Sequence, residues 1–131
     1  MSRIVIDTSA LVSMLLGEPA AEAVGSRLLS PPVRLIAEPT FFEARMVMSV
    51  RRGDPGRRLL DRFVDRAAIH RVAFDARLSD VAMLGWTRFG RGRHPAGLNF
   101  GDCFAYALAR VLNAPLLFVG DDFARTDLRP A

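Results

Sequence analysis

Short apolar runs alternate along the chain with longer segments in which apolar residues recur every three or four positions. The short runs are rich in Val, Ile and Leu and predict strands, at about residues 3–6, 33–37, 69–74 and 116–119. The longer segments predict helices, at about residues 8–16, 19–29, 40–52, 55–68, 75–89 and 99–112. Strands that alternate with helices are typical of a parallel sheet with helices on both faces. The pattern therefore predicts an α/β fold.

Polar and turn-forming residues mark where several of these helices begin and end. Thr8 or Ser9 can cap the first helix, and Asn99 can cap the last one. The Gly-Asp-Pro segment at 53–55 ends one helix and begins the next, because glycine terminates helices and proline suits a first turn. These signals divide the chain into short elements with no interdomain linker.

A length of 131 residues fits one compact domain over residues 1–131. The single cysteine, Cys103, excludes a disulfide scaffold and a cysteine-rich zinc module. The sequence has no apolar run approaching the roughly 18–20 residues that span a bilayer. Its first segment reaches an acid at Asp7, which is not the pattern of a signal peptide. We therefore expect a soluble, cytoplasmic protein that does not associate with membranes.

Arginine supplies every one of the 18 lysine-or-arginine positions. The absence of lysine excludes a Walker A phosphate loop and Schiff-base chemistry. It also counts against metal-dependent phosphatases and receiver-like phospho-acceptor domains, which usually place a lysine beside their aspartate. The formal charge of +4 and the sequence pI near 10.8 favour an anionic partner such as nucleic acid.

Acidic residues directly follow several predicted strands or lie in the first turn of the helix that comes next in the chain. These acids are Asp7, Glu38, Glu43, Asp102, Asp121 and Asp122. Because ligands bind beyond the carboxyl ends of parallel strands, we expect several of these acids to gather at one edge of the sheet. Helix N-termini carry partial positive charge and would keep such carboxylates ionised.

Several of these acids also have a purely local explanation. Thr40-x-x-Glu43 has the spacing of a capping box, and Asn99-x-x-Asp102 nearly has it. Asp7 is harder to explain locally, because an acid after a buried apolar strand is costly unless it is solvated or paired. Capping and ligand roles are compatible, so the joint placement of the acids favours a shared site.

Clustered carboxylates repel one another and need a counter-charge. Without lysine, the counter-charge is arginine or a metal ion, and ligands that are all oxygen favour Mg²⁺ or Mn²⁺. Zinc is disfavoured, because His70 and His94 lie far apart in the sequence and lack the HExxH spacing. The acids therefore predict a site for a hard divalent cation.

Four separate segments resemble those of the PIN-domain ribonucleases, and in particular the VapC-type toxins of bacterial toxin–antitoxin pairs. The segments are IVIDTSALVSMLL, EPTFFEARMVM, NFGDCFAYALA and APLLFVGDDFARTDL. The resemblance covers essentially the whole chain and keeps the family's order. It implies a PIN-like three-layer α/β/α sandwich with a central, mainly parallel sheet.

The resemblance also assigns roles to the acids. Asp7 and Asp102 correspond to the magnesium-binding acids, and Glu43 corresponds to the family's conserved helix acid. The fourth acid is Asp121 or Asp122, because many relatives space their last acids differently. We prefer Asp121, which lies closer to the end of the strand.

The pair of hydroxyl residues Thr8 and Ser9 matches the small hydroxyl pair after the first acid of the family. One of them would hydrogen-bond a ligand carboxylate or a metal-bound water, and helix capping is the alternative role. The implied activity is Mg²⁺-dependent endonucleolytic hydrolysis of RNA with a 5′-phosphate product, and Mn²⁺ can substitute for Mg²⁺. The implied partners are a VapB-type antitoxin, tRNA or ribosomal RNA, and a second copy in a homodimer. The rival functions are a metal-dependent phosphatase and a non-catalytic RNA-binding module.

Arginines supply the candidate contacts to RNA. Arg88, Arg91 and Arg93 flank a glycine-rich loop and would hold RNA phosphates, whereas a solvated flexible loop is the alternative. A second basic stretch starts at Arg51 and runs to residue 66, but acids dilute it. We expect this second stretch to form a solvated helix face.

Overall fold

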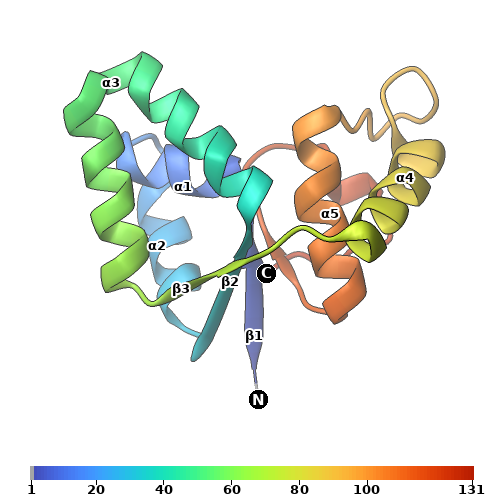
Figure 1. Ribbon diagram of the computed structural model, residues 1–131, viewed down its shortest axis with the longest axis horizontal. Coiled ribbons are helices and arrows are strands. Elements are labelled where there is room, and N and C mark those ends of the chain that lie inside the picture. Colours follow the sequence, from blue (N-terminus) through green and yellow to red (C-terminus); the bar gives the residue numbers. More distant parts are fainter. Residues whose placement is uncertain (1) are drawn as a thin grey trace.

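A four-stranded parallel sheet lies at the centre of the computed structural model, which describes residues 2–131 (Figure 1). The strands are β1 (Arg3–Ile6), β2 (Val33–Ala37), β3 (Ile69–Val72) and β4 (Leu116–Leu117). Their order across the sheet is β3-β2-β1-β4, and each neighbouring pair is parallel. Strand β1 therefore lies inside the sheet, where its apolar residues are buried.

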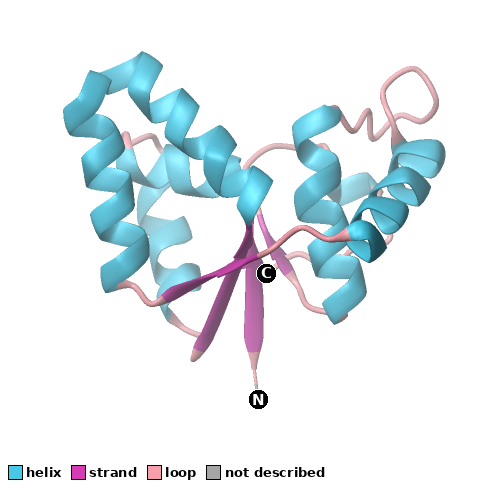
Figure 2. Ribbon diagram, in the orientation of Figure 1, coloured by secondary structure: helices cyan, strands magenta, loops and turns pink. Residues whose placement is uncertain are grey.

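Helices cover both faces of this sheet (Figure 2). Within residues 2–131 they are α1 (Thr8–Leu15), α2 (Ala21–Leu29), α3 (Glu38–Arg66), α4 (Ala76–Phe89), α5 (Phe100–Leu112) and the 3₁₀ helix η1 (Phe123–Arg125). Ile4 and Ile6 of β1 pack with α1, α2 and α3, whereas Val5 packs with α4 and α5. This alternation follows from the two-residue period of a strand. The predicted three-layer α/β/α sandwich is confirmed.

The long helix α3 contains the break that the sequence predicts. Gly53 has φ 65° and ψ −162°, so the helix is kinked there, and Pro55 lies in the turn that follows. A positive φ is readily adopted by glycine, which has no Cβ. The kink separates a first half, which approaches the sheet edge, from a second half that packs along the sheet face (Figure 1).

The structure differs from the sequence prediction at one helix start and at one helix cap. Helix α3 begins at Glu38 rather than Thr40, since Pro39 lies in its first turn, and its N-cap residue has no side-chain cap. The capping box predicted for Thr40 and Glu43 therefore does not form. Asp7, rather than Thr8 or Ser9, caps α1. Its carboxylate accepts a hydrogen bond from the backbone N–H of Ser9 at 3.0 Å.

The strand order creates a crevice beside the carboxyl end of β1. Strand β1 pairs with β2 on one side and with β4 on the other, and the backbone N–H of Asp7 donates to the Leu117 carbonyl at 3.0 Å. The chain returns from β3 across β1 to β4 through α4 and α5. In open α/β sheets this reversal of strand order is where ligands bind.

In residues 2–131, no helix combines the length and apolar character needed to cross a membrane.

Candidate active site

One pocket at the carboxyl edge of the sheet contains three of the predicted acids. Its volume is about 290 Å³. Asp7 follows β1, Glu43 projects from the first half of α3, and Asp102 lies in the first turn of α5. The full lining is Asp7, Thr8, Ser9, Val12, Ser13, Glu18, Glu43, Val47, Arg51, Asp102 and Val119. Residues that are far apart in the sequence are thus brought to one surface.

Asp7 is the most buried of these acids, with only 3% of its surface exposed. Its Oδ2 atom accepts hydrogen bonds from the Ser9 backbone N–H at 3.0 Å and from the Ser9 hydroxyl at 2.6 Å. Burial raises the pKa of Asp7 from 3.8 to about 6, and the nearby Glu43 carboxylate adds to this rise, although the Ser9 bonds oppose it. The backbone N–H of Thr8 also acts to lower the pKa of Asp7.

The hydroxyls of Thr8 and Ser9 hold the acids in position. The Ser9 hydroxyl donates to Asp7 and accepts from the Val119 backbone N–H at 3.0 Å, which links the ends of β1 and β4. The Thr8 hydroxyl lies 2.7 Å from Oε1 of Glu43 and 3.0 Å from the Thr40 carbonyl oxygen. Both hydroxyls therefore contact site carboxylates, while Asp7 itself caps the helix.

Asp102 is fixed by a complete capping box at the start of α5. Its Oδ2 atom accepts from the Asn99 backbone N–H at 3.0 Å, and its own N–H donates to the Asn99 side chain at 2.9 Å. Burial raises the pKa of Asp102 to about 7, and the carboxylates of Asp7 and Asp122 contribute to this rise. Capping and pocket-lining roles thus coincide in one residue.

The acid facing Asp102 from the turn after β4 is Asp122. Gly120 has φ 106°, which turns the chain before the two adjacent acids. Asp122 contributes to the raised pKa of Asp102, both through a side-chain contact and through its charge. Neither Asp121 nor Asp122 lines the acid pocket, and the interaction with Asp102 makes Asp122 a candidate for the fourth acid beside Asp121.

Glu38, which was expected among the gathered acids, lies elsewhere. It forms a two-pronged ion pair with Arg71 of β3, at 2.7 and 2.9 Å. This ion pair lowers the pKa of Glu38. Its carboxylate is neutralised by this arginine, in a surface hollow separate from the acid pocket.

Glu43 lies against the start of α5 because residue 101 is a glycine. A Cβ added at Gly101 would lie 2.4 Å from Oε2 of Glu43, well inside contact distance. The first turn of a helix presents free N–H groups and partial positive charge, which stabilises a nearby carboxylate. Gly101 therefore leaves the space that Glu43 occupies in the pocket.

The arginines predicted to contact RNA lie on α4 and the following loop, outside the pocket. Arg88 pairs with Asp127 at 3.4 Å, and Arg93 stacks on the Trp86 ring with its guanidinium carbon 4.7 Å from the ring centre. The loop is closed by hydrogen bonds between Leu98 and both Phe89 and Arg91. It is thus more ordered than a glycine-rich composition indicates.

Two charged residues that line the pocket, Arg51 and Glu18, were not expected there. Arg51 follows Glu43 and Val47 at intervals of four residues, so the three share one face of α3. That spacing was readable in the sequence. The sequence did not show which face of α3 would line the pocket.

The donor set of the pocket fits Mg²⁺ or Mn²⁺ better than zinc. In the part of the chain from Ser2 to Ala131, no group of three or more His, Cys, Asp or Glu side chains is placed as a metal cage. Asp7 and Asp102 each use one oxygen in local hydrogen bonds, which fixes the carboxylate. Mg²⁺ is commonly held by one or two carboxylates and keeps several waters, so two oriented acids suffice.

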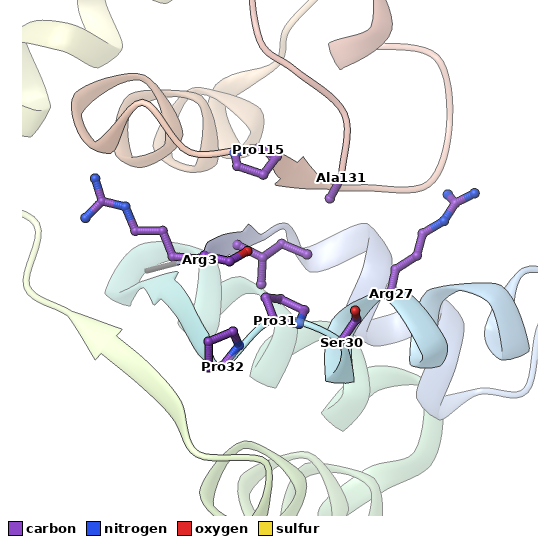
Figure 3. A pocket seen from close by; sticks show the side chains of 9 residues that line it. Arg3, Arg27, Ser30, Pro31, Pro32, Pro115 and Ala131 are labelled. Carbon is purple, nitrogen blue, oxygen red and sulfur yellow. The ribbon is translucent and has the colours of Figure 1, made fainter.

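A second hollow lies at the opposite, amino-terminal end of the sheet (Figure 3). Arg3 and Arg27 project from its two sides, and prolines form much of its wall. The guanidinium of Arg3 donates to the Leu112 carbonyl. With no Asp or Glu side chain in its lining, this hollow lacks the donors of the acid pocket.

Comparison with known proteins identifies the family. Residues 4–128 match the PIN domain. The chain belongs to the PIN-domain family. This PIN domain is 48% identical over 124 residues to a Ribonuclease VapC of Mycolicibacterium smegmatis, a match that covers 95% of this chain and 96% of that protein. It is 46% identical to Ribonuclease VapC30 of Mycobacterium tuberculosis, with 95% of each chain covered. The resemblance to VapC-type members of the family is confirmed.

Solved structures share the fold of this PIN domain. VapC20 of Mycobacterium tuberculosis, described as a sarcin–ricin-loop-cleaving toxin, superposes with a TM-score of 0.80 at 17% identity, covering 98% of both chains. VapBC2 of Rickettsia felis, bound to a DNA fragment from its promoter, gives a TM-score of 0.77 at 16% identity, covering 98% of this chain and 97% of that one. At these identities the comparison supports the architecture.

Proposed function

We propose that this PIN domain is a Mg²⁺-dependent endoribonuclease, the toxin of a VapBC-type pair. The observation that carries the proposal is the pocket that joins Asp7, Glu43 and Asp102 beside β1 and β4. Burial and mutual repulsion raise the pKa of Asp7 and of Asp102, which is the expected state of acids awaiting a cation. The two relatives from Mycolicibacterium smegmatis and Mycobacterium tuberculosis, at 48% and 46% identity, are named ribonucleases.

The side chains of the pocket would have different roles in the reaction. Asp7 and Asp102 would hold Mg²⁺, or Mn²⁺ in its place, through the oxygens not used in local hydrogen bonds. Glu43, fixed by Thr8, would orient the attacking water, and Asp121 or Asp122 would complete the acid set. A bound divalent ion supplies Lewis-acid stabilisation of the phosphate and makes a coordinated water more acidic.

Attack by water, and not by the ribose 2′-hydroxyl, predicts the chemistry of the product. Purified protein incubated with total tRNA and total ribosomal RNA should release fragments with 5′-phosphate ends when Mg²⁺ or Mn²⁺ is present. Cleavage should stop in EDTA. Fragments ending in 2′,3′-cyclic phosphate would contradict the proposal. Release of phosphate from a phosphomonoester without chain cleavage would favour a phosphatase, and binding without cleavage would favour an RNA-binding module.

The surface of α3 suits the protein partners that a VapC-type toxin requires. Phe42, Met46 and Val50 are 62%, 52% and 86% exposed and recur at four-residue intervals on this helix. Such an apolar stripe is unusual on a surface without a partner. We propose a VapB-type antitoxin and a second copy of the chain as partners, and Arg88, Arg91 and Arg93 as contacts to tRNA or ribosomal RNA.

Gly101→Ala tests whether the position of Glu43 matters for cleavage, and it does so without substituting any acidic residue. The added methyl group would force the Glu43 carboxylate away, because the atoms would otherwise lie 2.4 Å apart. We expect cleavage to fall at least about tenfold, because a displacement of about 1 Å in a group that positions a reactant can cost up to about 100-fold in rate. Alanine favours helix, so the thermal midpoint should not fall greatly.

Gly25→Ala in α2 is the matched control for this substitution. Its added Cβ would lie 3.7 Å from the Met14 sulfur, which is ordinary contact. Cleavage by the control should equal that of the wild type. Full activity of Gly101→Ala in the same assay would show that the position of Glu43 is unimportant.

A further inference from the structure

Arg51 brings a guanidinium group to the rim of the acid pocket. It lies on α3 two turns beyond Glu43, with Val47 between them on the same face, and all three line the pocket. A separation of eight residues is about 12 Å along a helix axis. The backbone of Arg51 therefore lies about two helical turns beyond the backbone of Glu43. The side chain of Arg51 is exposed to solvent.

The charge of Arg51 is not neutralised by an ion pair within the described residues. Two other arginines of α3 are paired within the protein, since Arg45 and Arg57 bind the two sides of Asp61, at 2.8 and 2.9 Å. Across residues 2–131, the Arg51 side chain takes part in no hydrogen bond and no ion pair, although Glu18 lines the same pocket. A charged side chain at a pocket rim without a protein partner is available to a ligand.

The acids of the pocket create an obstacle for an anionic substrate that Arg51 is placed to reduce. The four carboxylates that line the pocket repel an approaching phosphodiester, and the repulsion is strongest where they are buried. Arginine binds phosphate oxygens through two parallel N–H donors. Such a contact at the rim would hold the RNA without placing the guanidinium among the metal-binding oxygens.

We propose that Arg51 binds an RNA phosphate next to the scissile one and so positions the strand across the pocket. This inference rests on the proposed ribonuclease function and adds a substrate-binding residue to it. The matched control is Arg58→Ala, since Arg58 is another exposed arginine of α3 that lies outside the pocket. Arg51→Lys keeps the charge but removes the two-pronged geometry.

The decisive measurement compares Arg51→Ala, Arg51→Lys and Arg58→Ala with the wild type. Binding of fluorescently labelled bulk tRNA and ribosomal RNA is followed without divalent ions, and cleavage rates are measured over a range of RNA concentrations with Mg²⁺. For Arg51→Ala we expect KM and the RNA dissociation constant to rise roughly tenfold, the loss typical of one charged hydrogen-bonded contact. The value of kcat should stay within about twofold, since a uniform binding contact is lost. Arg51→Lys should be intermediate, and Arg58→Ala should resemble the wild type.

The dependence of binding on salt gives an independent readout. Loss of one phosphate contact should reduce the slope of log affinity against log salt by about one for Arg51→Ala. An RNA affinity of Arg51→Ala equal to that of Arg58→Ala would overturn the proposal. A fall in kcat with unchanged KM would also overturn it, because Arg51 would then act on the acids. Absence of cleavage by the wild type would refute the ribonuclease function, while the binding comparison would still decide the role of Arg51.

Discussion

Asp7→Asn is expected to lower RNA cleavage at least about 100-fold and, at the same time, to stabilise the metal-free protein. The loss of activity follows from removing a proposed metal ligand, since even groups that only orient such ligands contribute about 10–100-fold. The gain in stability follows from burial. Asp7 is almost completely enclosed, and an ionised carboxylate there is costly without a cation. Asparagine keeps an oxygen that can cap α1.

The gain in stability has a defined dependence on pH. The pKa of Asp7 is about 6 in the folded protein and 3.8 as its ordinary value. Below about pH 4 the Asp7 carboxyl is protonated in both the folded and the unfolded protein, so its burial does not lower the free energy of unfolding through a buried charge. Between 4 and 6 only the unfolded chain releases the proton, so the folded protein loses stability as pH rises. Above 6 the cost is complete, about 2–3 kcal/mol.

Thermal unfolding in EDTA at pH 4 and pH 8 measures this effect. The midpoint of Asp7→Asn should exceed that of the wild type by roughly 5–10 °C at pH 8, and the two should converge at pH 4. Asp80→Asn on the exposed surface of α4 is the control and should change neither stability nor cleavage. A lower midpoint for Asp7→Asn at pH 8 would mean that the hydrogen bonds to Ser9 outweigh the cost of burial.

Mg²⁺ should stabilise the wild type far more at pH 8 than at pH 5.5. Asp102 and Asp7, with pKa values of about 7 and about 6, must lose their protons to act as ligands. The apparent affinity should therefore fall by up to about tenfold per pH unit just below 7, and by up to about 100-fold per unit below 6. Each tenfold change in affinity alters the stabilisation by about 1.4 kcal/mol at saturating ion.

Calorimetric titration with Mg²⁺ at pH 5.5, 6.5 and 8 tests this dependence directly. The titration should also release protons between pH 6 and 7, which shows as a heat that varies with the buffer. Asp102→Asn should remove most of the binding. Equal Mg²⁺ affinity at pH 5.5 and pH 8 would contradict a site built on these two carboxylates.

Local sequence signals located much of the fold and three of the four acids that line the pocket, Glu18 being the exception. The glycine and proline around position 54 predicted the kink of α3, and Asn99 predicted the start of α5. The apolar run of β1 pointed to Asp7, because an acid that directly follows three buried strand residues is costly unless it is solvated or paired. These features depend on neighbouring residues, which is why sequence alone reveals them.

Features that depend on tertiary contacts were harder to predict. The capping box expected at Thr40 is absent, because α3 starts earlier and Glu43 instead meets Thr8 of another helix. The choice between adjacent acids after β4 depends on the turn at Gly120. The position of Arg51 depends on the face of α3 that packs against α1, which no short motif encodes.

The capping roles of Asp7 and Asp102 restrict how the proposed ribonuclease activity can be inhibited. Each carboxylate closes the first turn of its own helix, so moving it would unwind the start of α1 or α5. Removal of an N-cap costs about 1 kcal/mol, and each of these helices also packs against the sheet. An inhibitor is therefore expected to act by steric occlusion of an intact catalytic apparatus, so that activity returns as soon as the inhibitor dissociates, without any refolding step.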